Sequence, residues 1–376
     1  MQKVDYKKLL FLDGIRGLAA IYVMIGHARW LLWEGYSTGY VQHPEEYSLL
    51  NKLLVYSFSA FRYGHEAVLL FFVLSGFVIY LKYAVNLSNG NSQFDILAFY
   101  KRRIRRIMPP LLSALTITFI LDSIGIFADL PIYKMDTIYP SINENIGVSH
   151  TLNTLMGNLG FLMKFYTPVF GSDGPLWSLA YEGWFYITFP LFFVVLRKNS
   201  LLAGLIMVGL FVVANFIGTG FVLFDKVFGL MLCWWLGIVL ADIYVGRIKI
   251  KWIYLAPLVF LIPILILDLF PLIGHNLSSL YWSLGFFGMF STLFWMQSNN
   301  ISLQILEKLK ITGDFSYTLY VIHMPILVLF SGILMVQNEE KSLPSNFIFV
   351  FLGILFTMVV SKFVYHWVEK PFLTKR

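Results

Sequence analysis

The stretch LLAGLIMVGLFVVANFIGTGFV, residues 201–222, contains no charged side chain, and it decides the fold class. A helix of about 20 apolar residues is long enough to cross the hydrocarbon core of a bilayer. Residues 253–270 carry one charge, Asp268, and residues 346–360 carry none. These runs do not show the alternating ten-residue pattern of a transmembrane β-barrel. The sequence therefore predicts an all-α membrane protein.

Composition supports the same class. Of 376 residues, 58% are hydrophobic and only 13% are charged, whereas soluble domains have about 45–50% apolar and about 25% charged residues. This excludes a soluble enzyme, a disordered chain and a disulfide scaffold. The single cysteine, Cys233, cannot form an internal disulfide, and we expect it to be a buried, inert thiol.

About ten apolar segments are long enough to span a membrane, and the positions of Lys and Arg orient them. The segments are 9–33, 65–83, 108–127, 176–196, 201–221, 227–245, 252–272, 277–296, 314–336 and 346–367. With the amino terminus inside, 21 of the 28 Lys and Arg residues fall on the cytoplasmic side. The positive-inside rule then places both termini in the cytoplasm. The net charge of +7 therefore reflects topology in a multi-pass inner-membrane protein, and we expect no nucleic-acid partner.

Two outer segments are too short to cross. Residues 49–61 and 152–163 repeat apolar side chains at helical spacing, which predicts interfacial helices lying on the membrane. The long outer connection, residues 128–175, contains four prolines and predicts an ordered but irregular cap. We expect one integral membrane domain over residues 1–376, with no fused soluble domain.

Ionisable side chains inside spans are costly and are functional candidates by default. Arg16 and His27 are eleven residues apart in the first span, so they share a helix face at a separation of about 16 Å. Asp13 lies one turn before Arg16 and is placed to pair with it. Arg16 is alternatively a cytoplasmic anchor, and His27 is alternatively a structural hydrogen-bonding group.

The segment KRRIRR, residues 101–106, places five cations before the third span; we call it the basic cluster. Arginine binds phosphate and carboxylate groups in bidentate geometry, so the cluster predicts a phosphate site. Its alternative role is orientation in the membrane, with binding to anionic lipid.

Glu182 lies well inside the fourth span, at the same expected depth as His27. A carboxylate and an imidazole at one depth can act together in general base catalysis. The alternative is an interfacial carboxylate within the aromatic belt of Trp177, Tyr181 and Trp184. Five other acidic residues lie near span ends, where we expect solvated or capping roles: Glu66, Asp122, Asp225, Asp242 and Asp268.

Small and polar residues mark two further spans. Ser75 and Gly76 lie in the middle of the second span, where they favour close helix approach over a nucleophilic role for Ser75. Ser316, Tyr320 and His323 fall near one face of the ninth span, and we interpret that face as cavity lining.

Together these motifs resemble the acyltransferase 3 family of integral membrane acyltransferases, over residues 9–372. The matching motifs are the R-x10-H pair of Arg16 and His27, FFVLSGF at residues 71–77, RRIRRIMP at residues 102–109, LWSLAYE at residues 176–182 and SYTLYVIHMP at residues 316–325. Each motif alone is weak, and five in order are specific.

The resemblance implies transfer of an acyl group, most often acetyl, from cytoplasmic acyl-CoA to a hydroxyl of an envelope or exported carbohydrate, lipid-linked or polymeric. It implies no metal. The donor's phosphates would bind at Arg102, Arg103 and Arg106, together with Arg16. The remaining motif residues would line the substrate cavity: Trp177, Ser178, Ser75, Tyr320 and His323.

The mechanistic hypothesis assigns His27 as general base and Glu182 as the carboxylate that orients it and stabilises the imidazolium. In a variant, His27 carries the acyl group covalently. The competing class is a transporter or flippase of a sugar or anionic substrate, although such folds usually show two related halves, and this sequence shows no such symmetry. The acceptor, the chain length of the acyl group and the oligomeric state are left open.

Overall fold

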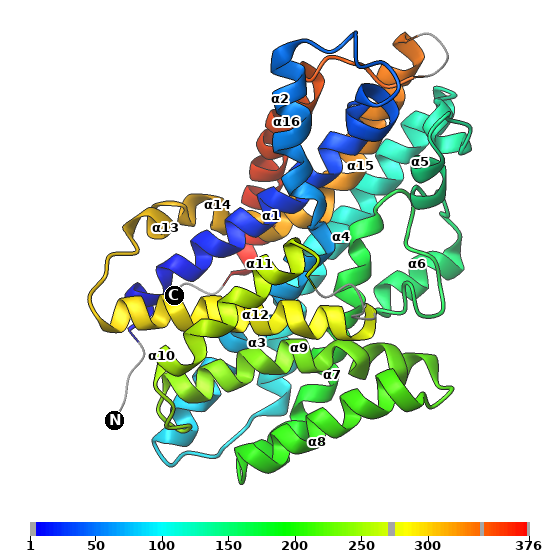
Figure 1. Cartoon of the computed structure of the whole chain (residues 1–376). Coiled ribbons are helices and arrows are strands. Elements are labelled where there is room, and N and C mark those ends of the chain that lie inside the picture. The colour runs from blue at the N-terminus through cyan, green and yellow to red at the C-terminus, as the bar shows by residue number, and fades with distance from the viewer. Residues whose placement is uncertain (1–4, 270–274, 339–341, 374–376) are drawn as a thin grey trace. The chain divides into compact units, whose positions relative to one another are not determined.

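A computed structural model describes residues 5–269, 275–338 and 342–373 (Figure 1). Within these ranges the regular elements are helices, and the only β pairing is an isolated bridge between Met163 and Thr167. Among the described residues, eight helical segments are long and apolar enough to cross a membrane. The all-α membrane class is thereby confirmed. Four of the 28 Lys and Arg residues lie outside the described ranges: Lys3, Lys341, Lys375 and Arg376.

The longer helices follow the predicted spans. They are α1 (Leu10–Leu31), α3 (Gly64–Ser88), α4 (Ile96–Phe127), α7 (Trp177–Leu196), α8 (Ser200–Val212), α9 (Val222–Tyr244), α12 (His275–Ser298), α15 (Ser316–Gln337) and α16 (Ile348–Val364). The shorter helices are α2 (Leu49–Ser59), α5 (Pro140–Asn145), α6 (Leu152–Leu159), α10 (Trp252–Leu255), α11 (Leu261–Ile266), α13 (Gln304–Lys308) and α14 (Lys310–Asp314).

Short 3-10 or π-helical turns extend or join these helices. They are η1 (Tyr6–Leu9), η2 (Gly35–Tyr40), η3 (Ala60–Arg62), η4 (Pro131–Lys134), η5 (Gly174–Leu176), η6 (Val213–Ile217), η7 (Ala256–Phe260), η9 (Tyr365–Glu369) and η10 (Lys370–Phe372).

Two of the ten predicted spans are not among the eight. The segment predicted at 252–272 is divided into α10, η7 and α11, and its residues 270–272 lie outside the described ranges. Pro257 and Pro263 explain the division, because proline lacks the amide hydrogen and clashes with the preceding turn. The segment predicted at 277–296 is α12, a helix of 24 residues, which is long enough to cross a membrane but less apolar than the eight.

Helix α4 is longer than its predicted span. It has 32 residues, or about 48 Å at 1.5 Å per residue, and it begins twelve residues before the expected position. The Oδ1 atom of Asp95 accepts a hydrogen bond from the Ala98 amide at 2.9 Å, which caps the helix start. The basic cluster therefore lies on the helix itself, and α4 continues through Pro109 and Pro110.

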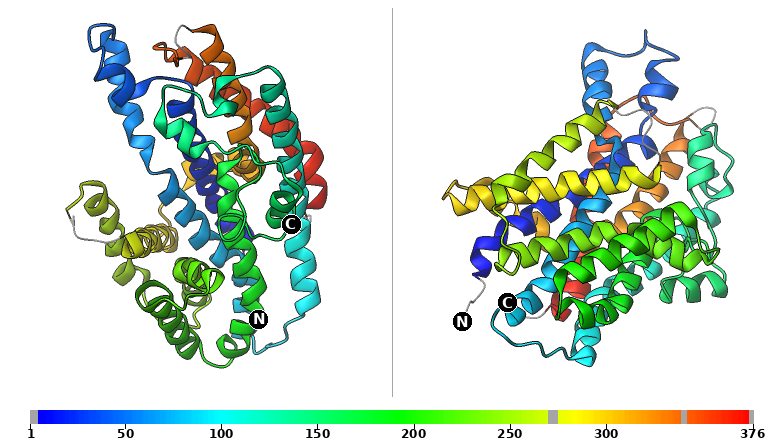
Figure 2. Two further views of the ribbon diagram at one scale, coloured as in Figure 1. Left: turned by 90° about the vertical axis from the view of Figure 1, so that its right-hand side faces the viewer. Right: turned by 60° about the horizontal axis from the view of Figure 1, so that its bottom comes forward.

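The chain divides into two compact units. The first contains Met1–Ala19, His65–Tyr100 and Tyr181–Thr312, and the second contains Ala20–Gly64, Lys101–Ala180 and Gly313–Arg376. In the first unit α9 packs against α8 and α12. In the second unit α15 packs along α16, as Figure 2 shows.

Glycines bring two backbones of the first unit into contact. A Cβ atom added to Gly76 of α3 would lie 2.1 Å from the Trp234 carbonyl oxygen of α9, and one added to Gly237 would lie 2.0 Å from the Val73 carbonyl oxygen. No side chain fits at either place. The close helix approach predicted at Ser75 and Gly76 is confirmed. Cys233, one residue before Trp234, is buried as predicted.

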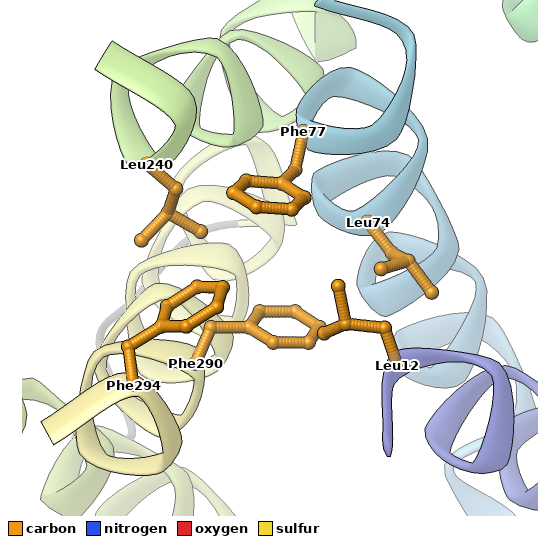
Figure 3. A pocket seen from close by; sticks show the side chains of 6 residues that line it. All are labelled: Leu12, Leu74, Phe77, Leu240, Phe290 and Phe294. Atoms are coloured by element: carbon orange, nitrogen blue, oxygen red, sulfur yellow. The ribbon is translucent and has the colours of Figure 1, made fainter. Parts of the chain in front are cut away.

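A small apolar pocket lies near this contact in the first unit (Figure 3). Its lining contains no polar side chain, so it offers no hydrogen-bonding group to a carbohydrate or a phosphate. It is lined by Leu12, Leu74, Phe77, Leu240, Phe290 and Phe294.

The two short outer segments are helical, as predicted, and correspond to α2 and α6. Ser48 and Thr151 cap them by accepting hydrogen bonds from the Asn51 and Thr154 amides. Both helices expose large apolar side chains, a pattern typical of interfacial helices; their position on the membrane remains a prediction. These side chains are Leu49, Leu50, Leu53, Tyr56, Leu152 and Met156.

The expected roles were wrong for two of the five acidic residues near span ends. Asp122 is fully buried, because the chain around Ser172 folds back against α4. Its carboxylate accepts hydrogen bonds from the Ser172 amide at 2.8 Å and hydroxyl at 2.6 Å, and it pairs with His150 Nε2 at 2.9 Å.

Asp242 is buried as well, with 1% exposed. Its carboxylate accepts hydrogen bonds from Tyr80 at 2.9 Å, Ser200 at 2.9 Å and Arg247 at 2.7 Å, so it joins α3, α8 and α9 within the first unit. By contrast, Asp225 has the expected capping role: it accepts hydrogen bonds from the Thr219 amide and hydroxyl.

Candidate active site

The structure brings two histidines of the second unit together. Nδ1 of His27 on α1 lies 2.8 Å from Nε2 of His323 on α15. The ring centroids are 5.1 Å apart and the ring planes differ by 13°. That separation is about the N···N distance plus two ring radii, so the rings meet edge to edge rather than face to face. We call His27 and His323 the histidine pair.

His323 is the fixed member of the pair. Its side chain is fully buried, and its Nδ1 lies 2.8 Å from the Tyr320 carbonyl oxygen and 3.1 Å from the Leu319 carbonyl oxygen. His27 is only partly buried. The ring of His323 is thus held by its own helix, whereas His27 keeps part of its surface exposed.

The start of α7 is tied to the same helix. Ser178 Oγ lies 2.8 Å from the Tyr320 hydroxyl, and both hydroxyls lie 3.2 Å from the Pro175 carbonyl oxygen. Three of the predicted cavity residues therefore lie close together in the second unit: Ser178, Tyr320 and His323. Trp177 is the first residue of α7 and is partly exposed.

Glu182 lies in the first unit and has its own hydrogen-bonding group. Its Oε1 accepts a hydrogen bond from Ser75 Oγ at 3.2 Å and another from the Tyr186 hydroxyl. The Trp234 indole in turn donates to Ser75 Oγ at 3.3 Å. Donors from α3 and α7 thus converge on one carboxylate oxygen and fix the orientation of the carboxyl group.

Tyr186 and Trp234 were missed by sequence reasoning. Tyr186 follows Glu182 by four residues, a spacing at which helix neighbours meet, so a signal existed. Trp234 lies on another helix, and nothing in the sequence connects it with Ser75.

His27 and Glu182 belong to different units. Their cooperation therefore remains a prediction.

Among the predicted donor-binding arginines, Arg106 has a buried partner. It forms an ion pair with Glu369, whose side chain is 1% exposed, and its guanidinium lies 5.3 Å from the centre of the Tyr317 ring. Glu369 also accepts hydrogen bonds from the Thr318 amide at 3.2 Å and hydroxyl at 2.6 Å. Sequence reasoning gave Glu369 no role.

The other arginines are partly exposed. Arg102 and Arg103 lie on α4 beside Arg106. Arg16 belongs to the first unit, and its guanidinium lies 3.3 Å from the Asp13 carboxylate, which confirms the pairing expected from their spacing. The structure thus places Arg16 in one unit and the three predicted donor-binding arginines of α4 in the other.

A second buried carboxylate, Asp173, lies just before α7. Burial, and then the charge of Asp122, raise the pKa of Asp173 well above its usual range. Thr118 Oγ1 lies 3.5 Å from its Oδ2, whereas its buried Oδ1 has no hydrogen-bonding partner among the described residues. Asp122 and Asp173 thus hold the end of the outer connection against α4.

One group of described residues brings possible metal ligands together. Ligand atoms of His43, Glu45 and Glu46 lie within 4.8 Å of one another, but all three side chains are exposed. Exposed acidic groups without a buried ligand do not make a specific site, so we assign no metal here.

Comparisons with known proteins agree with the motifs. A protein of Haemophilus influenzae without an assigned function is 28% identical over 134 residues, which is 35% of this chain and 49% of that protein. The O-acetyltransferase OatA of Staphylococcus aureus is 25% identical over 397 aligned positions, covering 97% of this chain and 57% of that protein. The chain spans about half the length of these curated relatives. No solved structure matches it.

The family comparison covers most of the chain. A family model described as an acyltransferase domain, that of acyltransferase 3, matches residues 9–366. This range includes His27, the basic cluster, Glu182 and His323. The chain therefore belongs to the acyltransferase 3 family.

Proposed function

We propose that the protein is a membrane O-acyltransferase that moves an acyl group, acetyl in the first instance, from acyl-CoA to a hydroxyl of a carbohydrate. The observation that carries the proposal is the histidine pair, in which a partly exposed His27 is held by a buried ring at 2.8 Å. The printed name of OatA, an O-acetyltransferase, supports a hydroxyl acceptor and an acetyl group. The carbohydrate acceptor follows from the family resemblance.

In the proposed reaction His27 is the general base. Its ring takes the proton of the acceptor hydroxyl while the hydroxyl oxygen attacks the thioester carbonyl. The carbon–sulfur bond then breaks, and the imidazolium returns its proton to the leaving CoA thiolate. The products are the acyl ester and free CoA, so no further reactant is needed.

Glu182 has the second role in this proposal. Its carboxylate, oriented by Ser75 and Tyr186, stabilises the imidazolium that forms on His27. Orientation of the His27 ring does not depend on Glu182, because His323 already contacts Nδ1.

The donor's phosphates bind to arginines. Arg102 and Arg103 of α4 supply charge and bidentate hydrogen bonds, and Arg16 contributes from α1. Arg106 is committed in part to Glu369, so we expect it to contribute less charge to a phosphate than Arg102 or Arg103.

Transfer of label tests the function. Membranes containing the protein are incubated with radiolabelled acetyl-CoA and an extract of lipid-linked and polymeric saccharides. We expect label on saccharide with the natural chain and with His43→Ala, an exposed histidine of the same unit, and none above background with His27→Ala. Full transfer by His27→Ala would refute the assignment. Saccharide movement across the membrane without label would indicate a transporter instead.

Donor binding is tested separately. Arg102→Ala and Arg103→Ala should each weaken acyl-CoA binding by about tenfold or more, the loss expected for one charged hydrogen bond. Lys362→Ala removes an exposed cation of α16 in the same unit and should leave binding unchanged. Unchanged affinity in both arginine variants would contradict the proposed donor site.

A further inference from the structure

The hydrogen-bonding partners of His323 determine which of its nitrogens carries the proton. Nδ1 faces two backbone carbonyl oxygens, those of Tyr320 and Leu319. Carbonyl oxygens only accept hydrogen bonds, so Nδ1 must be the protonated nitrogen. A neutral imidazole carries one N–H group, and Nε2 of His323 therefore presents a lone pair.

The proton on His27 then follows. Nδ1 of His27 lies 2.8 Å from Nε2 of His323, and a contact this short between two nitrogens needs one hydrogen between them. Because His323 Nε2 has none, His27 Nδ1 must donate. The edge-to-edge arrangement of the rings, with planes 13° apart, suits a nearly linear N–H···N bond.

The second nitrogen of His27 is thereby left with its lone pair. If His27 carried its proton on Nε2, two lone pairs would face each other across 2.8 Å, and the buried His323 would lose its partner. The carbonyl oxygens of α15 thus select the tautomer of His27, acting through the ring of His323.

We infer that His323 is a positioning residue for acyl transfer, which holds His27 in the Nδ1–H tautomer and leaves Nε2 of His27 as the atom that receives the acceptor's proton. This inference rests on the proposed role of His27 as general base. A neutral ring here has the orienting role that a carboxylate has in a Ser-His-Asp triad. It orients His27 without adding a charge, which leaves stabilisation of the imidazolium to another group.

Two substitutions separate the hydrogen bond from the volume of the side chain. In His323→Gln the amide oxygen is the same number of bonds from Cβ as Nε2 is, so it can accept the hydrogen bond from His27. In His323→Phe the ring is kept and the acceptor is lost. We expect His323→Gln to retain kcat within about tenfold and His323→Phe to lose at least about 10²-fold, the usual range for general base catalysis. KM for acyl-CoA and for the acceptor should stay unchanged in both.

The tautomer is measured directly by 15N NMR of the intact protein labelled with [15N]histidine in detergent. The chain contains seven histidines, and His27 is assigned by the signals that disappear in His27→Ala. We expect Nδ1 of His27 to carry hydrogen and Nε2 to carry none. This measurement uses the natural chain and does not depend on the folding of a variant.

The outcomes distinguish the inference from the function on which it rests. A protonated Nε2 in the neutral His27 ring, or natural kcat in a folded His323→Phe protein, would overturn the inference. If His27→Ala keeps full transfer while the NMR shows the expected tautomer, the general base assignment fails and the hydrogen-bond arrangement stands. Loss of transfer in His27→Ala and in His323→Phe, with recovery in His323→Gln, would support both.

Discussion

The ion pair of Arg106 and Glu369 gives a quantitative prediction for the second unit. Glu369 is 1% exposed and Arg106 is 26% exposed. Glu369→Gln removes the charge but keeps an oxygen that can accept from Thr318. Removing one partner of a buried pair costs about 3–5 kcal/mol. Because a quarter of Arg106 is exposed and water replaces part of its interaction, we expect the free energy of unfolding to fall by about 2–3 kcal/mol, the value of hydrogen bonds to charged groups.

Two further variants complete the test. Glu369→Ala also loses the hydrogen bonds from the Thr318 amide and hydroxyl, at about 1 kcal/mol each, so its total loss should be about 4–5 kcal/mol. A double-mutant cycle compares Arg106→Ala, Glu369→Gln and the double variant. We expect the stability loss of the double variant to be about 2 kcal/mol smaller than the sum of the two single losses. Lys370→Gln, at the exposed neighbouring residue, should change stability by less than about 0.5 kcal/mol.

The assay is equilibrium unfolding in detergent micelles, followed by tryptophan fluorescence. If the stability loss of the double variant equals the sum of the two single losses within about 0.5 kcal/mol, the energetic pairing of Arg106 with Glu369 is refuted. Acyl-CoA binding measured on the same proteins separates the two roles of the arginine. If Arg106 also binds the donor's phosphates, Arg106→Ala weakens donor binding, whereas Glu369→Gln keeps it.

Three other substitutions test particular contacts. Ser75→Ala removes a hydrogen-bond donor to Glu182. It should lower kcat for acyl transfer by about tenfold, the effect of one charged hydrogen bond, and leave KM unchanged. A kcat equal to that of the unsubstituted protein would show that this bond does not position Glu182. Asp173→Asn should raise the melting temperature at pH 7. Burial raises the pKa of Asp173, so the folded protein favours the protonated carboxyl group. The stability that this protonated group contributes is lost as the pH rises through the raised pKa, and an asparagine avoids that loss. The gain should shrink as the pH falls toward about 4, the ordinary pKa of an aspartic acid, and a gain independent of pH would contradict the assignment. Gly171→Ala should destabilise the fold by about 1–3 kcal/mol in the same unfolding assay, because φ is +56° and the added Cβ would lie 2.3 Å from Asp122 Oδ2; natural stability would refute the close contact.

Features set by local composition were predictable from the sequence. Apolar runs such as residues 201–222 mark helices because transfer into hydrocarbon depends on the side chains themselves. Asp13 and Arg16 pair at a spacing fixed by helix geometry. Gly76 marks a close approach because only a missing side chain permits one.

Features set by packing between distant segments were not predictable. His27 and His323 are 296 residues apart, and the sequence showed each as a candidate without showing that they meet. Asp122 lies where a span ends, so solvation was the reasonable expectation. It is buried because Ser172, 50 residues later, folds back onto it.

The contact of Gly76 with Gly237 limits how this sequence can change. Each added Cβ would meet a backbone atom of the opposite helix, and a backbone atom cannot be made smaller by a substitution elsewhere. Second-site suppressors of a Gly76 substitution should therefore not arise among the side chains around it. Each glycine is constrained by itself, so the two positions should not covary among relatives that keep this helix pair.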